Sequence, residues 1–169
     1  KNMKAKLQKT TLLRESSEWR LISLLFECPV GDWQANVKNL ADETTDSGLK
    51  TAAEFAKVEA SEGLYHSIFG PGGPAPAREV TYRSWVQPGY LLSELSAFYK
   101  AFSYQPNLQE SPDHIAVETG FMAYLKLKEA FAEECGDKEN VEITAKAAKT
   151  FNDEHLAKFT EQIAKSLAS

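Results

Sequence analysis

Seven residues in the middle of the chain, Gly70 to Pro76, include three prolines and three glycines. Proline fixes φ and lacks a backbone N–H, so no regular helix or strand can run through this segment. On both sides of it, apolar residues recur three and four positions apart, as on the buried face of a helix. The sequence therefore predicts an all-α fold, a single-domain multi-helix bundle with a long Pro/Gly-rich central loop, or arm, at about residues 70–87.

The apolar spacing also locates the individual helices. We expect helices at about residues 10–27, from Asp32 onward, from 49 toward 69, at 88–104, at 112–134 and at 140–167. The pattern allows a break in the last helix near Thr150. A short alternation from Val80 to Val86 would also fit one strand, but a lone strand would have nothing to pair with.

Length, charge and cysteine content narrow the class of protein. The chain has 169 residues and a formal net charge of −5, which fits one domain covering residues 1–169 and argues against a nucleic-acid binder. Cys28 and Cys135 lack the spacing of a zinc motif, so we expect two reduced thiols and no metal. No apolar run reaches the ~18 residues of a membrane span. Charged residues interrupt the N-terminal segment, so we expect a cytoplasmic protein.

The segment from Ser111 to Met122 opens the helix expected at 112–134. Ser111 is a favourable N-cap, Pro112 fits the first helical position, and Asp113 suits the positive end of the helix dipole. A structural role therefore explains these residues as well as a functional one does. His114 and Glu118 lie four positions apart on one helix face, where an acid and a histidine are able to perform acid–base chemistry. No recognisable nucleophile or metal-binding motif accompanies them.

The other histidines and Met122 have simpler interpretations. His155 belongs to an apolar ladder with a four-residue period, so we expect it to be packed inside the protein, and we expect the same of His66. Met122 fits the core face of its helix, although methionine also suits the wall of an adaptable peptide groove.

Three segments, in this order, resemble the TorD/DmsD/NarJ-type chaperones that help molybdoenzyme subunits mature. The first runs from Tyr65 through Phe69 to Gly72, with the proline-rich arm and Tyr82 after it. The second is Pro112-Asp113-His114-Ile115 with Glu118 and Phe121-Met122, similar to the most recognisable motif of the family. The third runs from Phe151 to the His155-Leu156 pair. With the all-helical pattern, the resemblance covers most of the chain.

The resemblance implies a non-catalytic chaperone that needs no cofactor of its own. Its partner would be the N-terminal leader, often of twin-arginine type, of a molybdopterin oxidoreductase catalytic subunit, held during cofactor insertion and before assembly or export. Carried over by position, the peptide-binding residues would be Asp113, His114, Glu118, Met122 and Tyr82. Because a leader combines arginines with an apolar run, its receptor needs an apolar groove rimmed by acids.

Two alternatives to a chaperone remain open from the sequence. One is a small acid–base enzyme that uses His114 with Asp113 or Glu118, and the other is a helical interaction module with an unrelated partner. The oligomeric state is also open. The protein would be a monomer, or a dimer that exchanges helices across the central arm, since hinge loops favour swapping.

Overall fold

The computed structural model describes residues 2–169, and these are helical apart from short connections and the central arm. The helices are α1 (Asn2–Leu25), α2 (Trp33–Glu43), α3 (Ser47–Glu59), α4 (Glu62–Phe69), α5 (Glu79–Tyr82), α6 (Pro88–Ala101), α7 (Ile115–Cys135), α8 (Lys138–Glu154), the 3-10 turn η1 (Leu156–Lys158) and α9 (Thr160–Ala168). The all-α prediction is confirmed. None of the described helices is both long and apolar enough to cross a membrane.

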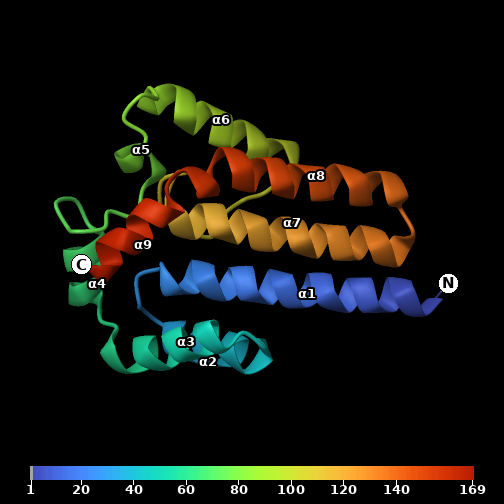
Figure 1. Cartoon of the computed structure of the whole chain (residues 1–169), viewed down its shortest axis with the longest axis horizontal. Helices are drawn as coiled ribbons and strands as arrows, with labels where there is room; N and C mark the ends of the chain where they lie inside the picture. The colour runs from blue at the N-terminus through green and yellow to red at the C-terminus, as the bar shows by residue number, and fades with distance from the viewer. Residues whose placement is uncertain (1) are drawn as a thin grey trace.

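The three longest helices, α1, α7 and α8, lie side by side and alternate in direction (Figure 1). Helices α2 and α3 pack on α1, on the side away from α7, and α6 lies along α8. The short helices α4, α5 and α9 gather at the end where α7 begins. Helix α7 is therefore the central element of the bundle, with neighbours on both sides.

Two apolar clusters hold the bundle together. The larger one surrounds α7, whose Phe121 and Leu125 are fully buried, and it includes side chains from α6, α8, η1 and α9. The smaller one lies between α1, α2 and α3 and contains Leu21, Trp33 and Val37. Because α7 is covered on several faces, it is apolar nearly all round, as expected of a central helix.

The helix predictions are largely confirmed, but several ends differ; α1, for example, begins at Asn2 rather than near residue 10. The segment expected as one helix from 49 toward 69 is two helices, because Ser61 starts a new one: its Oγ accepts from the Leu64 N–H at 3.2 Å. The break in the last helix falls at His155 rather than near Thr150. The His155 ring turns inward there and its Nδ1 lies 3.0 Å from a carboxylate oxygen of Glu79.

The central arm is irregular as expected, but it is not a surface loop. Ala75, Ala77 and Glu79 are buried, and the alternation that would fit a strand forms the helical turn α5 instead. The arm runs past the start of α7, where the Glu79 N–H donates to the Asp113 carbonyl at 2.9 Å and the Ile115 N–H donates to the Ala77 carbonyl at 2.8 Å. Two backbone hydrogen bonds thus fasten the arm to the beginning of the central helix.

Candidate functional site

Helix α7 begins one turn later than the sequence predicts, and its cap is His114. The imidazole Nδ1 accepts a hydrogen bond from the Ala116 N–H at 3.1 Å, which satisfies one of the free N–H groups of the first turn. The prediction that Ser111 is the N-cap and Pro112 the first helical residue is wrong. The reason is that the Ser111 hydroxyl donates to the Asp113 carboxylate at 2.6 Å instead of binding the helix.

Asp113 is fully buried and holds the arm in place. Its Oδ1 accepts from the Arg78 guanidinium at 2.8 and 3.0 Å, and its Oδ2 accepts from the Val80 N–H at 3.1 Å. A buried carboxylate is stable only when its oxygens find such partners. Asp113 therefore joins the beginning of α7 to Arg78 and Val80 of the arm.

His114 is only 5% exposed, and both ring nitrogens are in use. Since Nδ1 accepts from Ala116, Nε2 carries the proton of the neutral ring and donates to the Tyr65 hydroxyl at 3.0 Å. Burial lowers the pKa of His114 from its usual value, which favours this neutral form. Both ring nitrogens of His114 are therefore engaged within the protein.

Glu118 is buried one turn into α7, and neither carboxyl oxygen has a hydrogen-bond partner within the described residues. Burial raises the pKa of Glu118 well above its usual value, and the negative charge of nearby Glu79 raises it further. The neutral, protonated form of Glu118 is therefore favoured. Glu79 itself is paired with Arg83 and His155.

The structure thus brings the three family-like segments into direct contact. Tyr65 of the first binds His114 of the second, and Glu79, at the end of the arm, binds His155 of the third. Phe121 and Phe151 pack edge to face, with ring centroids 4.8 Å apart. These residues form one buried network around the beginning of α7.

This burial corrects one expectation from the sequence. Asp113, His114, Glu118 and Met122 lie inside the protein, so the expectation that the Asp-His pair borders an open surface is wrong. Tyr82 is half-buried, with its hydroxyl donating to the Pro76 carbonyl at 2.8 Å. Asp113, His114 and Tyr82 use their polar atoms to bind other parts of this chain.

The histidines outside the motif differ from each other. His155 is 1% exposed, so the prediction that it is packed is confirmed. The same prediction for His66 is wrong, because its side chain is 63% exposed on α4. Only one face of the short helix α4 packs against the bundle, and His66 lies outside that face.

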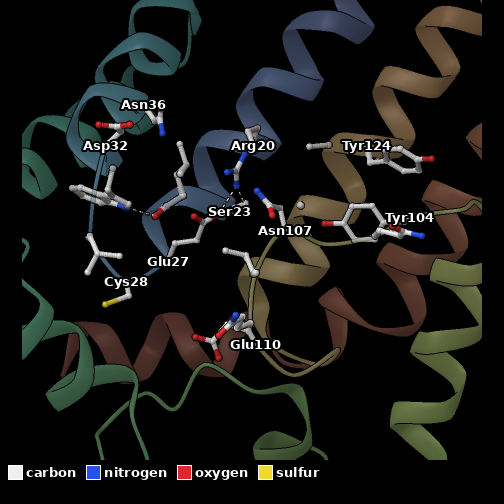
Figure 2. Close-up of a pocket in the computed structure, with 18 of the residues that line it drawn as sticks. Arg20, Ser23, Glu27, Cys28, Asp32, Asn36, Tyr104, Asn107, Glu110 and Tyr124 are labelled. Atoms are coloured by element: carbon white, nitrogen blue, oxygen red, sulfur yellow. Dashed lines mark hydrogen bonds and ion pairs between the residues drawn. The ribbon is translucent and has the colours of Figure 1, made fainter.

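The open feature beside the buried network is a groove of about 640 Å³ (Figure 2). Its walls come from the end of α1, the start of α2, the loop at 104–110 and the middle of α7. The lining residues that matter most are Arg20, Ser23, Leu24, Glu27, Trp33, Tyr104, Leu108, Glu110, Gly120 and Tyr124. The residues that line this groove were not predicted, because all of them except Gly120 lie outside the motif segments and they come together only when α1 and α7 pack.

Close packing of polar and aromatic groups shapes the floor of the groove. The Ser23 hydroxyl donates to the Ala116 carbonyl at 2.7 Å, which ties α1 to the first turn of α7. Trp33 donates from its indole N–H to the Leu24 carbonyl at 2.7 Å. Gly120 leaves room for Tyr104, since a Cβ at this position would lie 2.8 Å from the tyrosine hydroxyl oxygen. Burial raises the pKa of Tyr104 to about 12, so its hydroxyl stays protonated.

The charge in the groove is predominantly negative. Arg20 is the one cation among the lining residues, and it pairs with Glu27 inside the groove (Figure 2). Asp32 and Glu110 are exposed at the rim, and neither forms an ion pair among the described residues. A lining that mixes apolar and polar groups, with free carboxylates at its edge, suits a ligand that is both apolar and cationic.

The buried network and the groove share one stretch of backbone. Glu110 at the rim is followed by Ser111 and Asp113, and Gly120 of the floor lies on the helix that His114 caps. The contacts of Asp113 and His114 therefore fix the positions of two groove walls without entering the groove. The one sequence signal for the groove was this adjacency of an exposed acid to the motif.

Comparison with known proteins identifies a family. Residues 33–165 match the family model described as nitrate reductase delta subunit. This match covers α2 to α9 and includes all three segments that meet at the buried network. No curated protein matches the sequence at a significant level.

Proposed function

The chain belongs to the nitrate reductase delta subunit family of redox-enzyme maturation chaperones, and we propose that its groove binds the N-terminal leader of a molybdoenzyme catalytic subunit. The chaperone would act in the cytoplasm, where it would hold the client during cofactor insertion and before assembly or export. The observation that carries this proposal is the groove between α1 and α7, with exposed apolar residues in its lining and free acids at the rim.

The lining of the groove is suited to the two chemical parts of a leader. Val30, Leu108 and Leu127 offer apolar surface to a hydrophobic run, and burial of such surface supplies most of the affinity in helix-in-groove binding. Asp32 and Glu110 are placed to pair with arginines of the leader. Carboxylates bind guanidinium groups in two-pronged geometry, which orients the peptide.

Asp113, His114 and Glu118 would support this function indirectly. Because they are buried, we propose that they position the groove walls rather than touch the peptide. Met122 and Tyr82 would have the same supporting role. Variants of these residues should change leader binding only as far as they change the fold.

The proposal is tested by titrating the protein with leader peptides from molybdoenzymes of the same genome, using a scrambled peptide as reference. We expect Glu110→Lys to weaken the binding of a matching leader by about 3- to 10-fold, because it exchanges an attractive rim charge for a repulsive one. Glu142→Lys, an equally exposed acid on α8 and outside the groove, is the matched control. A leader that binds no better than its scrambled version contradicts the proposal.

A double-mutant cycle locates the contact more sharply. A leader with its arginines replaced by glutamine should bind more weakly to the unaltered protein and should lose its sensitivity to Glu110→Lys. If the two changes are simply additive, the arginines do not pair with Glu110 and the orientation proposed here is wrong.

A further inference from the structure

Three side chains of different metal-binding types meet beside the groove. Cys28 lies in the turn after α1, and Glu62 and His66 lie one helical turn apart on α4. One sulfur, oxygen or nitrogen atom from each lies within 4.8 Å of the other two. No other group of this kind occurs among residues 2–169 with such spacing, and the proposed binding of a leader does not use it.

We propose that Cys28, Glu62 and His66 form a binding site for a zinc ion, with water as the fourth ligand. Thiolate, imidazole and carboxylate are the three protein ligands that zinc accepts, and a tetrahedral site needs them to converge from one side. The mixture of one soft sulfur ligand with nitrogen and oxygen favours zinc over calcium or magnesium, which require oxygen ligands.

The geometry needs only small movements of exposed side chains. Ligand atoms of a tetrahedral zinc site lie roughly 3–4 Å apart, as follows from metal–ligand distances of about 2.0–2.3 Å. The His66 Nε2 and a Glu62 carboxylate oxygen are already 3.9 Å apart, and their side chains are 63% and 66% exposed. Both are therefore free to close on the metal without disturbing the core.

Cys28 supplies the fixed point of the site. It is partly buried, and its carbonyl accepts from the Val30 N–H at 2.9 Å in the turn between α1 and α2. Its sulfur lies at the edge of the groove and points away from the Arg20–Glu27 pair (Figure 2). The turn thus presents the sulfur while the two ligands on α4 adjust to it.

The surrounding charge favours a cation at this position. Burial raises the pKa of the Cys28 thiol, and the negative charges of Glu62 and Glu110 raise it further. A divalent ion reverses this effect: the thiol releases its proton to water as the sulfur binds the metal. The negative charges of Glu62 and Glu110 thus disfavour a free thiolate at Cys28 but favour a bound cation.

Zinc at this site would connect elements that otherwise meet through side-chain packing alone. It would join the turn after α1 to α4, and Cys28 also lines the groove. The metal would therefore hold one edge of the groove at a fixed distance from α4. This inference stands apart from leader binding, and the two are measured separately.

The test uses the full chain, freed of metal with a chelator that is then removed. Titration with Zn²⁺ by calorimetry gives the affinity, and Co²⁺ gives the spectrum, since a cysteine ligand produces a sulfur-to-cobalt charge-transfer band in the near ultraviolet. We expect one metal per chain and this band. Cys28→Ser should abolish the band and weaken Zn²⁺ binding by more than about 10-fold, because loss of a direct ligand should exceed loss of a supporting contact.

Two further variants make the result specific. His66→Ala should also weaken Zn²⁺ binding by more than about 10-fold, whereas Cys135→Ser should bind as the unaltered protein does, because Cys135 lies outside the cluster. Circular dichroism checks that each variant is folded. The proposal is overturned if the unaltered protein binds no Zn²⁺, if Cys28→Ser binds it equally well, or if His66→Ala has no effect. Leader titration with and without zinc shows independently whether the groove functions.

Discussion

The raised pKa of Glu118 gives the sharpest test of the buried network. In the folded protein its carboxyl group is fully buried without a hydrogen-bond partner, and its pKa lies well above its ordinary value of 4.5. In the unfolded chain the group ionises near that ordinary value. Between the two pKa values the folded state holds a proton that the unfolded state has lost. Unfolding therefore becomes more favourable as the pH rises.

The expected magnitude follows from this linkage. Over that interval the free energy of unfolding should fall by about 1.4 kcal/mol for each pH unit because of Glu118 alone. Glu118→Gln replaces the acid with a neutral side chain of nearly the same shape and removes this dependence. The variant should thus gain stability relative to the unaltered protein as the pH rises, and the gain should level off once the folded protein also ionises.

Urea denaturation followed by circular dichroism, from about pH 5 to about pH 8, measures the difference between the two proteins. Using the difference cancels the titration of other groups, including His114. Glu59→Gln, an exposed acid at the end of α3, controls for the chemical change itself. A difference that stays constant with pH would refute the reasoning, because it would mean that Glu118 has the same charge in the folded and unfolded states.

Three other substitutions test the contacts around the first turn of α7. Asp113→Ala should reduce the free energy of unfolding in urea by about 1–3 kcal/mol, because it leaves the Val80 N–H without its partner, whereas the Arg78 side chain is 45% exposed and remains hydrated; a loss below about 0.5 kcal/mol would mean that the arm is held by other contacts. His114→Asn should keep most of the helix cap, whereas His114→Ala should lose about 1–2 kcal/mol in the same assay, and equal stabilities would contradict the cap. Gly120→Ala should destabilise the protein by about 1–3 kcal/mol through contact with the Tyr104 hydroxyl, and removing that oxygen in Tyr104→Phe should restore part of the loss.

Helices were predictable from the sequence where local signals set their ends. Pro88 begins α6, Gly136 with its positive φ ends α7, and apolar spacing located the rest. The prediction failed where a side chain had two possible partners. Ser111 would cap a helix in isolation, but Asp113 lies near enough to take its hydroxyl, and the cap passes to His114. The tertiary contacts with Arg78 and the Val80 N–H fix Asp113 in that position.

The candidate site was less predictable for a related reason. The sequence located Glu118 and Met122 correctly on α7 and Asp113 and His114 at its beginning, yet it gave no information on which side chains face the interior. Asp113 and Glu118 would ordinarily be expected at a surface because buried acids are rare. Their burial depends on the arm, which supplies Arg78 and Glu79 from more than thirty positions away. The groove residues on α1 and α7 share no local pattern, so only their packing shows that they form one surface.

The fastening of the arm bears on how two copies of this chain could intertwine. Domain swapping needs a hinge loop that makes few contacts with the rest of the protein. In this protein the connector is held by three backbone hydrogen bonds. The N–H groups of Ala75, Ala77 and Glu79 donate to the carbonyls of Ile68, Phe69 and Asp113 respectively. Conversion of a monomer into a domain-swapped dimer would break these hydrogen bonds and separate the helices after the arm from those before it. Whichever form arises as the chain leaves the ribosome should therefore persist, with conversion as slow as complete denaturation.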